Sequence, residues 1–553
     1  MDNLGIVSMI QSALSGRRGM IAVFAVAVIG TIGIAFAPTP GGLSIRGQYA
    51  LATMFFVGML WVTGALPLAV TALCVPILLT GFGVYPTMDE ALAGFADHII
   101  FLFLAGFMLA NALQKYDIDR RIALSVLARM GTSPRKLVAA VMLATAFLSM
   151  WVSNTATAAM MMPIALGVLA QVLGREAISA VDDNPNATID SSVSTDGGES
   201  VNSGVAATED DFRNLQVAML LGTAYAASVG GVGTLIGTPP NAILAGQLSS
   251  TLNYDIGFVQ WLAVGLPIVV ITLPIIWYLL TYVLYPPRID DVSGARQQAQ
   301  EYLREEGELS TRGKRVVYIF SATAFLWVIG GLGSFVQPYI SAPVYTTLFG
   351  GEGPTLLGVS GHGGLLYYVL IGLAAVPALV LADTMEWDEL VDIDWGTLLL
   401  FGGGIALANA LADSGATEWI ADTVFGGLVG APILLVILVV VLLVIFLTEM
   451  TSNAATTSII APILIGLGGI FAGTLGLGNL PAALFLAVSG TIAASFAFAL
   501  PVATPPNAIV FGSGYVKQDQ MIRAGVVLNL LMTFVLVVLI WVMFQFLWPL
   551  VLW

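Results

Sequence analysis

Long apolar segments recur along the chain, and few charged residues interrupt them. A helix needs about 20 apolar residues to cross a bilayer, whereas a membrane β-barrel would show strands of about ten residues with alternating polarity. The pattern therefore predicts an all-α polytopic membrane protein with about 11 transmembrane helices. The predicted spans are 20–37, 48–66, 68–81, 99–114, 215–247, 257–285, 316–336, 365–382, 396–412, 482–513 and 523–548.

Two further apolar stretches, 137–173 and 431–475, each carry a polar cluster at the centre. The first cluster reads Ser-Met-Trp-Val-Ser-Asn-Thr over 149–155, and the second reads Thr-Glu-Met-Thr-Ser-Asn-Ala over 448–454. Each apolar arm beside a cluster is about 16–20 residues long, which is short for a complete span. We therefore predict two re-entrant hairpins that enter and leave the membrane on the same side.

The distribution of lysine and arginine supports this topology, because cytoplasmic loops are enriched in both. With the N-terminus cytoplasmic, every lysine and arginine except Arg46 falls on the inner side, and the C-terminus lies outside. If 137–173 crossed once, the basic loop 286–315 would move outside. Two complete spans in each stretch would give the same sidedness, so charge alone leaves that alternative open.

Three motifs occur twice in the same order, which indicates an internal duplication. The hairpins open on opposite sides in the predicted topology, so the repeats are inverted, as in many secondary transporters. The offset between copies falls from 299 to 266 residues across an acidic insert at 176–211, which is predicted to be a disordered addition to the first copy. The matched segments are 109–113 with 407–411, 153–154 with 452–453, and 237–243 with 503–509.

Composition narrows the function. Hydrophobic residues make up 58% of the chain and charged residues 10%, against about 25% charged in soluble domains. A soluble enzyme and a nucleic-acid binder are thereby excluded. A single cysteine, Cys74, and two distant histidines, His98 and His362, argue against a disulfide or a transition-metal site. The net charge of −15 comes partly from acidic runs at 182–211 and 383–394, which we interpret as solvated surface.

The polar clusters predict four helix breaks inside the protein. Ser-Asn in each hairpin and Thr-Pro-Pro-Asn in each half should cap a helix that starts within the membrane. Such N-termini favour a small anion, and the carbonyls that end the preceding helices suit Na⁺. No lysine or arginine lies in any break, which favours coupling of the anion to a cation.

These motifs, together with Leu-Phe-Gly-Gly-Gly at 400–404, resemble the divalent anion:sodium symporter family (DASS). The resemblance implies a homodimeric elevator transporter for dicarboxylates, tricarboxylates or sulfate, with a scaffold and a mobile transport domain in each protomer. It needs no cofactor other than the coupling ion. The implied division is 1–98 scaffold, 99–255 first repeat core, 256–395 scaffold with the loop 286–315, 396–522 second repeat core and 523–553 C-terminal helix.

The resemblance also implies ligands. The substrate would contact Asn154, Thr155, Thr238, Ser452, Asn453 and Pro505. One Na⁺ site would use Ser149, Ser153, Asn154 and Gly237, and a second would use Thr448, Thr451, Asn453 and Ala503. The family's second tripeptide usually ends in threonine, where this chain has Ala454.

The function predicted is Na⁺-coupled symport of small divalent anions across the cell membrane, with lipid, Na⁺ and the anion as partners. The alternatives are a cation-independent carboxylate exchanger and a passive channel. Glu449 is an acid deep in a hairpin arm, where it could titrate, hold a cation or pair within the arm. Asn111 and Asn409 occupy equivalent repeat positions and are interpreted as hydrogen-bonding glue between helices.

Overall fold

The computed structural model describes residues 16–129, 131, 133–173, 209–289 and 292–552. Within this part, nine helices are long and apolar enough to cross a membrane, which makes the chain a multi-pass membrane protein. They are α2 (Arg17–Phe36), α3 (Ile45–Thr63), α6 (His98–Lys115), α13 (Phe258–Tyr278) continued by η2 (Leu279–Leu284), α15 (Thr311–Gly331), α20 (Trp395–Asp413), α22 (Ile433–Met450), α23 (Asn453–Leu475) and α26 (Gln518–Phe546).

Shorter apolar helices occupy the remaining predicted spans. These are α4 (Leu68–Gly81), α18 (Tyr368–Leu381) and α24 (Asn479–Ala494). The predicted span 215–247 is broken into α11 (Glu209–Gly231) and α12 (Pro239–Leu252), and 482–513 is broken into α24 and α25 (Pro505–Gly512). Both breaks fall at Thr-Pro-Pro-Asn, as the sequence predicts, because proline at the first helical position starts a new helix there.

The two stretches with central polar clusters form helical hairpins. The first consists of α8 (Pro134–Ser149) and α9 (Asn154–Leu173), and the second of α22 and α23. With 16 residues, α8 is only about 24 Å long, less than the hydrocarbon core of about 30 Å. An arm of this length suits a re-entrant segment better than a complete span, whereas α22 and α23 are long enough to cross a membrane.

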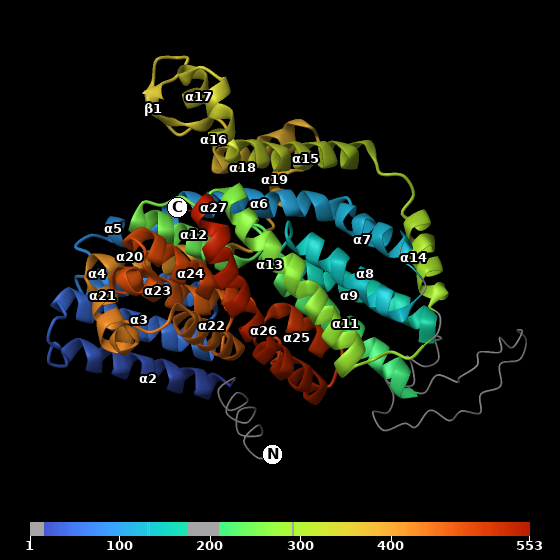
Figure 1. The fold of residues 1–553 in the computed structure, drawn as a ribbon, viewed down its shortest axis with the longest axis horizontal. Coiled ribbons are helices and arrows are strands. Elements are labelled where there is room, and N and C mark those ends of the chain that lie inside the picture. Colours follow the sequence, from blue (N-terminus) through green and yellow to red (C-terminus); the bar gives the residue numbers. More distant parts are fainter. Residues whose placement is uncertain (1–15, 130, 132, 174–208, 290–291, 553) are drawn as a thin grey trace, which may run out of the picture.

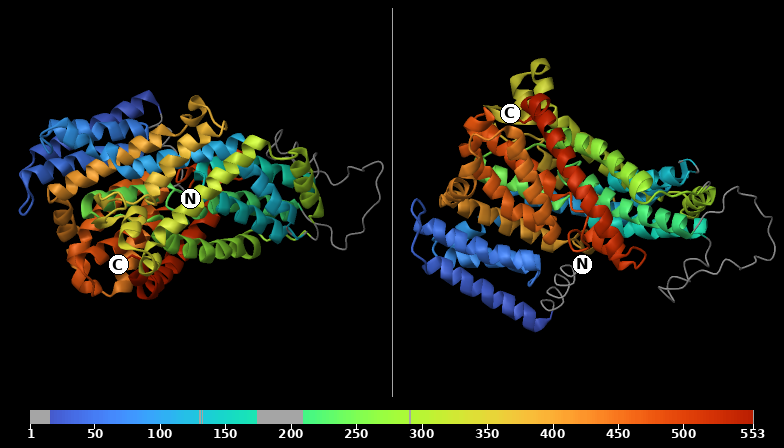
Figure 2. Two further views of the ribbon diagram at one scale, coloured as in Figure 1. Left: turned by 90° about the horizontal axis from the view of Figure 1, so that it is seen from above. Right: turned by 60° about the horizontal axis from the view of Figure 1, so that its bottom comes forward.

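The duplicated order appears directly in the structure. Helices α6, α8, α9, α11 and α12 correspond to α20, α22, α23, α24 and α25. Figures 1 and 2 place the α8–α9 hairpin and the α22–α23 hairpin in different halves of the molecule, with α11 beside the first and α24 beside the second. The all-helical membrane architecture predicted from the sequence is confirmed, and the predicted duplication is seen in the matching order of helices.

Small residues allow the hairpins to pack closely on these neighbours. A Cβ on Gly230 of α11 would lie 2.4 Å from the Ala146 carbonyl of α8, and a Cβ on Gly468 of α23 would lie 2.5 Å from Ala483 of α24. Glycine and alanine are typical of membrane helix interfaces because they let backbones approach. The hairpins are therefore held by close backbone packing within each repeat.

Several elements were not predicted from the sequence. Helices α7 (Ile118–Arg129) and α14 (Ser293–Glu305) lie in predicted basic loops, and α17 (Ala342–Phe349) with the antiparallel strands β1 (Gly351–Pro354) and β2 (Ser360–His362) forms a projection at the top of Figure 1. Of the acidic insert 176–211, all but the last three residues lie outside the described residues. The other short elements are α5 (Met88–Leu92), η1 (Ala93–Ala96), α16 (Gly333–Val336), η3 (Gln337–Tyr339), α19 (Trp387–Leu390), α21 (Ala416–Ile420), η4 (Ala421–Phe425), η5 (Gly426–Leu428) and α27 (Trp548–Val551).

Candidate functional site

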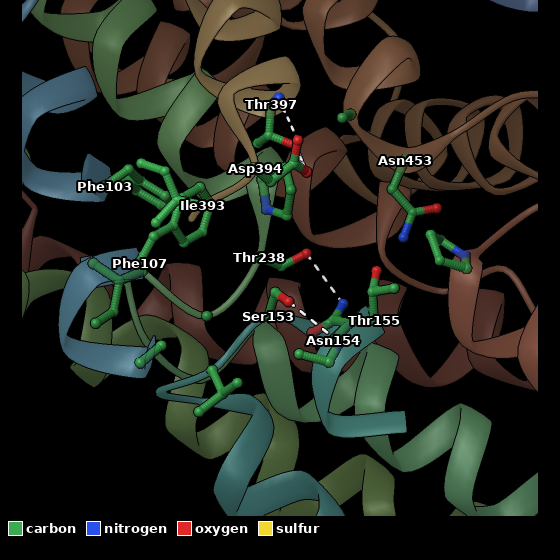
Figure 3. A pocket seen from close by; sticks show the side chains of 18 of the residues that line it. Phe103, Phe107, Ser153, Asn154, Thr155, Thr238, Ile393, Asp394, Thr397 and Asn453 are labelled. Carbon is green, nitrogen blue, oxygen red and sulfur yellow. Dashed lines mark hydrogen bonds between the residues drawn. The ribbon is translucent and has the colours of Figure 1, made fainter. Parts of the chain in front are cut away.

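The four predicted breaks meet at one cavity of about 510 Å³. Its lining includes 153–155 and 452–454 from the hairpin tips and 238–240 and 504–506 from the two Pro-Pro breaks. Figure 3 shows Asn154, Thr155, Thr238 and Asn453 around this space. The tertiary structure thus brings together motifs that are separated by up to about 350 residues in the chain.

The side chains at the breaks act largely as the sequence predicts. The Ser153, Ser452 and Thr504 hydroxyls accept hydrogen bonds from the amides of Ala156, Ala455 and Asn507, at 3.3, 3.1 and 3.2 Å. Each hydroxyl caps the helix that starts at the cavity. Thr238 differs, because its hydroxyl does not cap α12 but donates to Oδ1 of Asn154 at 3.2 Å.

Helices α9, α12, α23 and α25 therefore all start at the cavity wall. The first amides of a helix lack intrahelical partners, and the helix dipole makes its N-terminus favourable for negative charge. Among the described residues that line the cavity there is no lysine, arginine or histidine. Binding of an anion here would depend on amides, hydroxyls and the two asparagine side chains.

A cluster of oxygen atoms lies directly behind the first hairpin tip. The cluster consists of Oγ of Ser149 and the carbonyl oxygens of Ala227 and Gly237, and the Asn154 amide faces all three. Hydrogen bonding orients this amide so that Nδ2 donates to them at 2.6, 3.0 and 3.3 Å. Ser149 and Asn154 are both buried. Hydroxyl and carbonyl oxygens of this kind, at the ends of broken helices, are suited to Na⁺. Of the four ligands predicted from the sequence, Ser149 and Gly237 belong to this cluster and Asn154 contacts it through Nδ2. The Ser153 hydroxyl caps α9 instead, and Ala227 was not predicted.

The second hairpin repeats this arrangement. Oγ1 of Thr448 lies 2.8 Å from Oδ1 of Asn453 and 2.9 Å from the Ala494 carbonyl, and both side chains are buried. Ala503 occupies the position of Gly237 in this half. The Thr451 hydroxyl donates to the Trp61 carbonyl of α3 at 3.2 Å. This bond uses the hydroxyl proton of Thr451, whereas its hydroxyl oxygen keeps lone pairs.

Further side chains support both clusters in matching positions. Asn241 Nδ2 donates to the Gly231 and Thr234 carbonyls at 3.0 and 2.8 Å, and Asn507 Nδ2 donates to the Ala497 and Leu500 carbonyls at 3.2 and 3.1 Å. Sequence reasoning assigned no role to either asparagine, although both belong to the duplicated motif. Each half also buries side-chain oxygens without a partner among the described atoms, including those of Thr157, Ser228 and Asn241 and of Thr456, Ser495 and Asn507.

Glu449 is paired within the protein. Its carboxylate accepts hydrogen bonds from the amides of Phe498, Ala499 and Leu500 at 2.6, 2.8 and 2.9 Å, and from Nδ2 of Asn529 at 2.6 Å. These amides belong to the unwound segment between α24 and α25, and Asn529 lies in α26. The sequence predicted that a pairing of Glu449 would lie within the hairpin arm. The partners instead lie outside the arm, because α26 and the unwound segment pack against α22.

The remaining cavity wall was missed by sequence reasoning. It consists of Phe103, Phe107, Asn111 and Gln114 on α6, and of Asp392, Ile393, Asp394, Thr397 and Leu400 around the start of α20. Asn111 Nδ2 donates to the Asp392 carbonyl at 2.6 Å and to the Glu389 carbonyl at 3.3 Å, consistent with its interpretation as glue. The α6 residues recur every three to four positions and so share one face of the helix. This spacing is the one sequence feature that could have indicated this part of the wall.

Duplicated repeats with broken helices around one cavity are typical of secondary transporters. A solved structure of the YdaH transporter of Alcanivorax borkumensis has a similar fold, with a TM-score of 0.51, 14% identity, and coverage of 96% of this chain and 97% of that one. The family model described as "sodium:sulfate symporter transmembrane region" matches residues 18–553. The chain belongs to this family.

Relatives named as transporters align along most of their length. An uncharacterized transporter of Haemophilus influenzae is 38% identical over 486 residues, which cover 88% of this chain and 89% of the relative. The sodium-dependent dicarboxylate transporter SdcS is 32% identical in Staphylococcus saprophyticus and 33% identical in Staphylococcus aureus USA300, over 91% of this chain and 87% of each relative. The family resemblance predicted from the sequence is confirmed.

Proposed function

We propose that this protein is a Na⁺-coupled symporter of small divalent anions. The observation that carries the proposal is a single cavity bordered by four helix N-termini and two buried oxygen clusters, without a basic side chain among its described lining residues. Bound Na⁺ would supply the positive charge that this wall lacks. The names of the SdcS relatives favour dicarboxylates, and the description of the family favours sulfate.

The predicted ligands are compatible with this function. All six predicted substrate contacts line the cavity: Asn154, Thr155, Thr238, Ser452, Asn453 and Pro505. Asn154 and Asn453 also contact the oxygen clusters. Each asparagine would therefore contact both an anion and a cation, and this shared contact is how binding of one would favour binding of the other.

We also propose a direction for the cavity. Its rim is formed partly by the exposed Asp392 and Asp394, which lie in the segment that joins α18 to α20. Hydrogen bonds from Lys115, at the end of α6, hold this segment in place. In the orientation predicted from charge, this rim faces the cytoplasm. The conformation would then be inward-facing, and transport would proceed by an elevator movement in a homodimer.

The coupling can be tested with purified protein in proteoliposomes. Uptake of labelled succinate and of labelled sulfate is measured with an inward Na⁺ gradient and with K⁺ in its place. We expect Na⁺-driven accumulation of at least one of the two anions. Uptake that ignores Na⁺ but responds to internal unlabelled anion would contradict symport and support a carboxylate exchanger instead.

Ala454 offers a test of how the anion sits at the second hairpin tip. Its buried methyl group lines the cavity where Thr155 presents a hydroxyl in the first repeat. A hydrogen bond to a charged group contributes about 1.5–3 kcal/mol, or about a ten- to hundredfold change in affinity. We expect Ala454→Thr to tighten binding of the transported anion, measured as the apparent affinity for succinate, citrate and sulfate.

Weaker binding in Ala454→Thr would show that a less polar part of the anion packs against the methyl group. Unchanged affinity for all three anions would mean that residue 454 does not touch the substrate. Thr155→Ala is the matched change in the other repeat, and we expect it to weaken binding by a comparable factor.

A further inference from the structure

The cavity proposed to bind an anion carries only acids as charged side chains among its described lining residues, Asp392 and Asp394. Both are exposed at the rim. In Figure 3, Asp394 lies beside Thr397 on the same cavity wall as Ile393, with Asn453 on another part of the wall. Negative charge at the entrance of an anion site opposes binding, so its presence calls for a physical explanation.

Capping explains the position of Asp394 but not its charge. The amide of Thr397 donates to Oδ1 of Asp394 at 3.1 Å, and the Thr397 hydroxyl donates to Oδ2 at 2.5 Å. Asp394 is therefore the N-cap of α20 and is held in one orientation. Asparagine and serine cap helices as well as aspartate does. The cap requires a hydrogen-bond acceptor, and the carboxylate charge is an additional property.

The base nearest to this rim along α6 is already paired. Nζ of Lys115 lies 2.5 Å from the Glu389 carboxylate and donates to the Thr384 carbonyl at 3.1 Å. Hydrogen bonds from the Glu386 amide and from Lys115 hold the pKa of Glu389 below its usual range, so this carboxylate stays charged. The positive charge of Lys115 is therefore balanced by the carboxylate of Glu389. The negative charge of Asp394 remains to influence ions that enter the cavity.

We propose that Asp394 is a specificity-determining residue that selects anions by their charge. Its fixed carboxylate raises the local concentration of Na⁺. It also weakens the binding of each anion, and the effect grows with the charge of the anion. The energy between two charges scales with their product, so a trianion is penalised more than a dianion. This inference rests on the proposed function and names a determinant of the substrate class.

Asp394→Asn tests the inference, because asparagine retains the cap and removes the charge. Equilibrium binding of succinate and of citrate to the full chain in detergent is measured at pH 7.5 with saturating Na⁺. If each unit of anion charge contributes about a threefold factor, affinity rises about 9-fold for the dianion and about 27-fold for the trianion. The Na⁺ concentration for half-saturation rises about threefold, since an attractive charge is lost.

Ionic strength gives an independent readout. The variant and the wild type are expected to differ in their affinity for succinate, their affinity for citrate and their half-saturating Na⁺ concentration. Added choline chloride should reduce all three differences, because salt screens an exposed charge. Asp97→Asn is the matched control. Asp97 caps α6, the counterpart of α20 in the first repeat, by accepting from the Ile99 amide at 2.9 Å, and it is not among the lining residues. We expect this control to leave the charge selectivity unchanged.

The outcomes separate this inference from the proposed function. Equal shifts for succinate and citrate, or a Na⁺ affinity that does not fall, would overturn the role of Asp394. If citrate binds neither the wild type nor the variant, succinate and Na⁺ suffice for the test. Tighter succinate binding together with weaker Na⁺ binding in Asp394→Asn would then support the role of Asp394. A wild-type protein that binds no anion in any condition would overturn the proposed function, and the inference with it.

Discussion

Asn154→Ala and Asn453→Ala are each expected to abolish Na⁺-driven uptake while the protein still folds. Each side chain lies at a hairpin tip where it lines the cavity and also contacts a buried oxygen cluster, so one substitution would remove a proposed contact to the anion and a proposed contact to the cation. A hydrogen bond to a charged group contributes about 1.5–3 kcal/mol. Loss of two such contacts corresponds to at least about a hundredfold loss of affinity.

The measurement is initial uptake in proteoliposomes, together with size-exclusion chromatography to verify folding. Asn409→Ala is a matched control, because Asn409 is a partly buried asparagine of α20 that does not line the cavity. We expect this variant to retain uptake. Near-normal uptake in Asn154→Ala or in Asn453→Ala would reduce that asparagine to a packing role.

Glu449→Ala is expected to lower the stability of the folded protein. The carboxylate satisfies three amides of the unwound segment 495–504 and the side chain of Asn529. Each buried donor that loses its partner costs about 1–3 kcal/mol. We expect the apparent melting temperature in detergent to fall by several degrees, and the fall to be smaller in Glu449→Gln, which keeps one acceptor oxygen.

Glu418→Ala serves as the control, since Glu418 is an exposed acid outside the hairpins. Surface changes of this kind usually alter stability by less than about 0.5 kcal/mol. If Glu449→Ala melts at the same temperature as the wild type, the amides of 498–500 find other partners. The interpretation of Glu449 as the support of the second break would then be wrong.

Sequence patterns were informative wherever chemistry is local. Apolar runs located the spans, and the two Thr-Pro-Pro-Asn motifs located the breaks between α11 and α12 and between α24 and α25. Both follow from short-range physics, because bilayer thickness sets the length of a helix and proline removes a backbone donor. Amphipathic α7 and α14 were missed, since loops rich in charge carry no apolar run that would signal a helix.

By itself, the sequence determined that this chain lies in a membrane, that it is internally duplicated, and where its helices break. Only the tertiary structure decided that the four breaks share one cavity, that Glu449 of α22 supports the unwound segment beside α25, and that Asp394 borders the proposed anion site. These contacts join residues tens to hundreds of positions apart. Periodicity and short motifs indicate the surroundings of a residue and its local backbone conformation. Its long-range partners depend on how whole helices pack together.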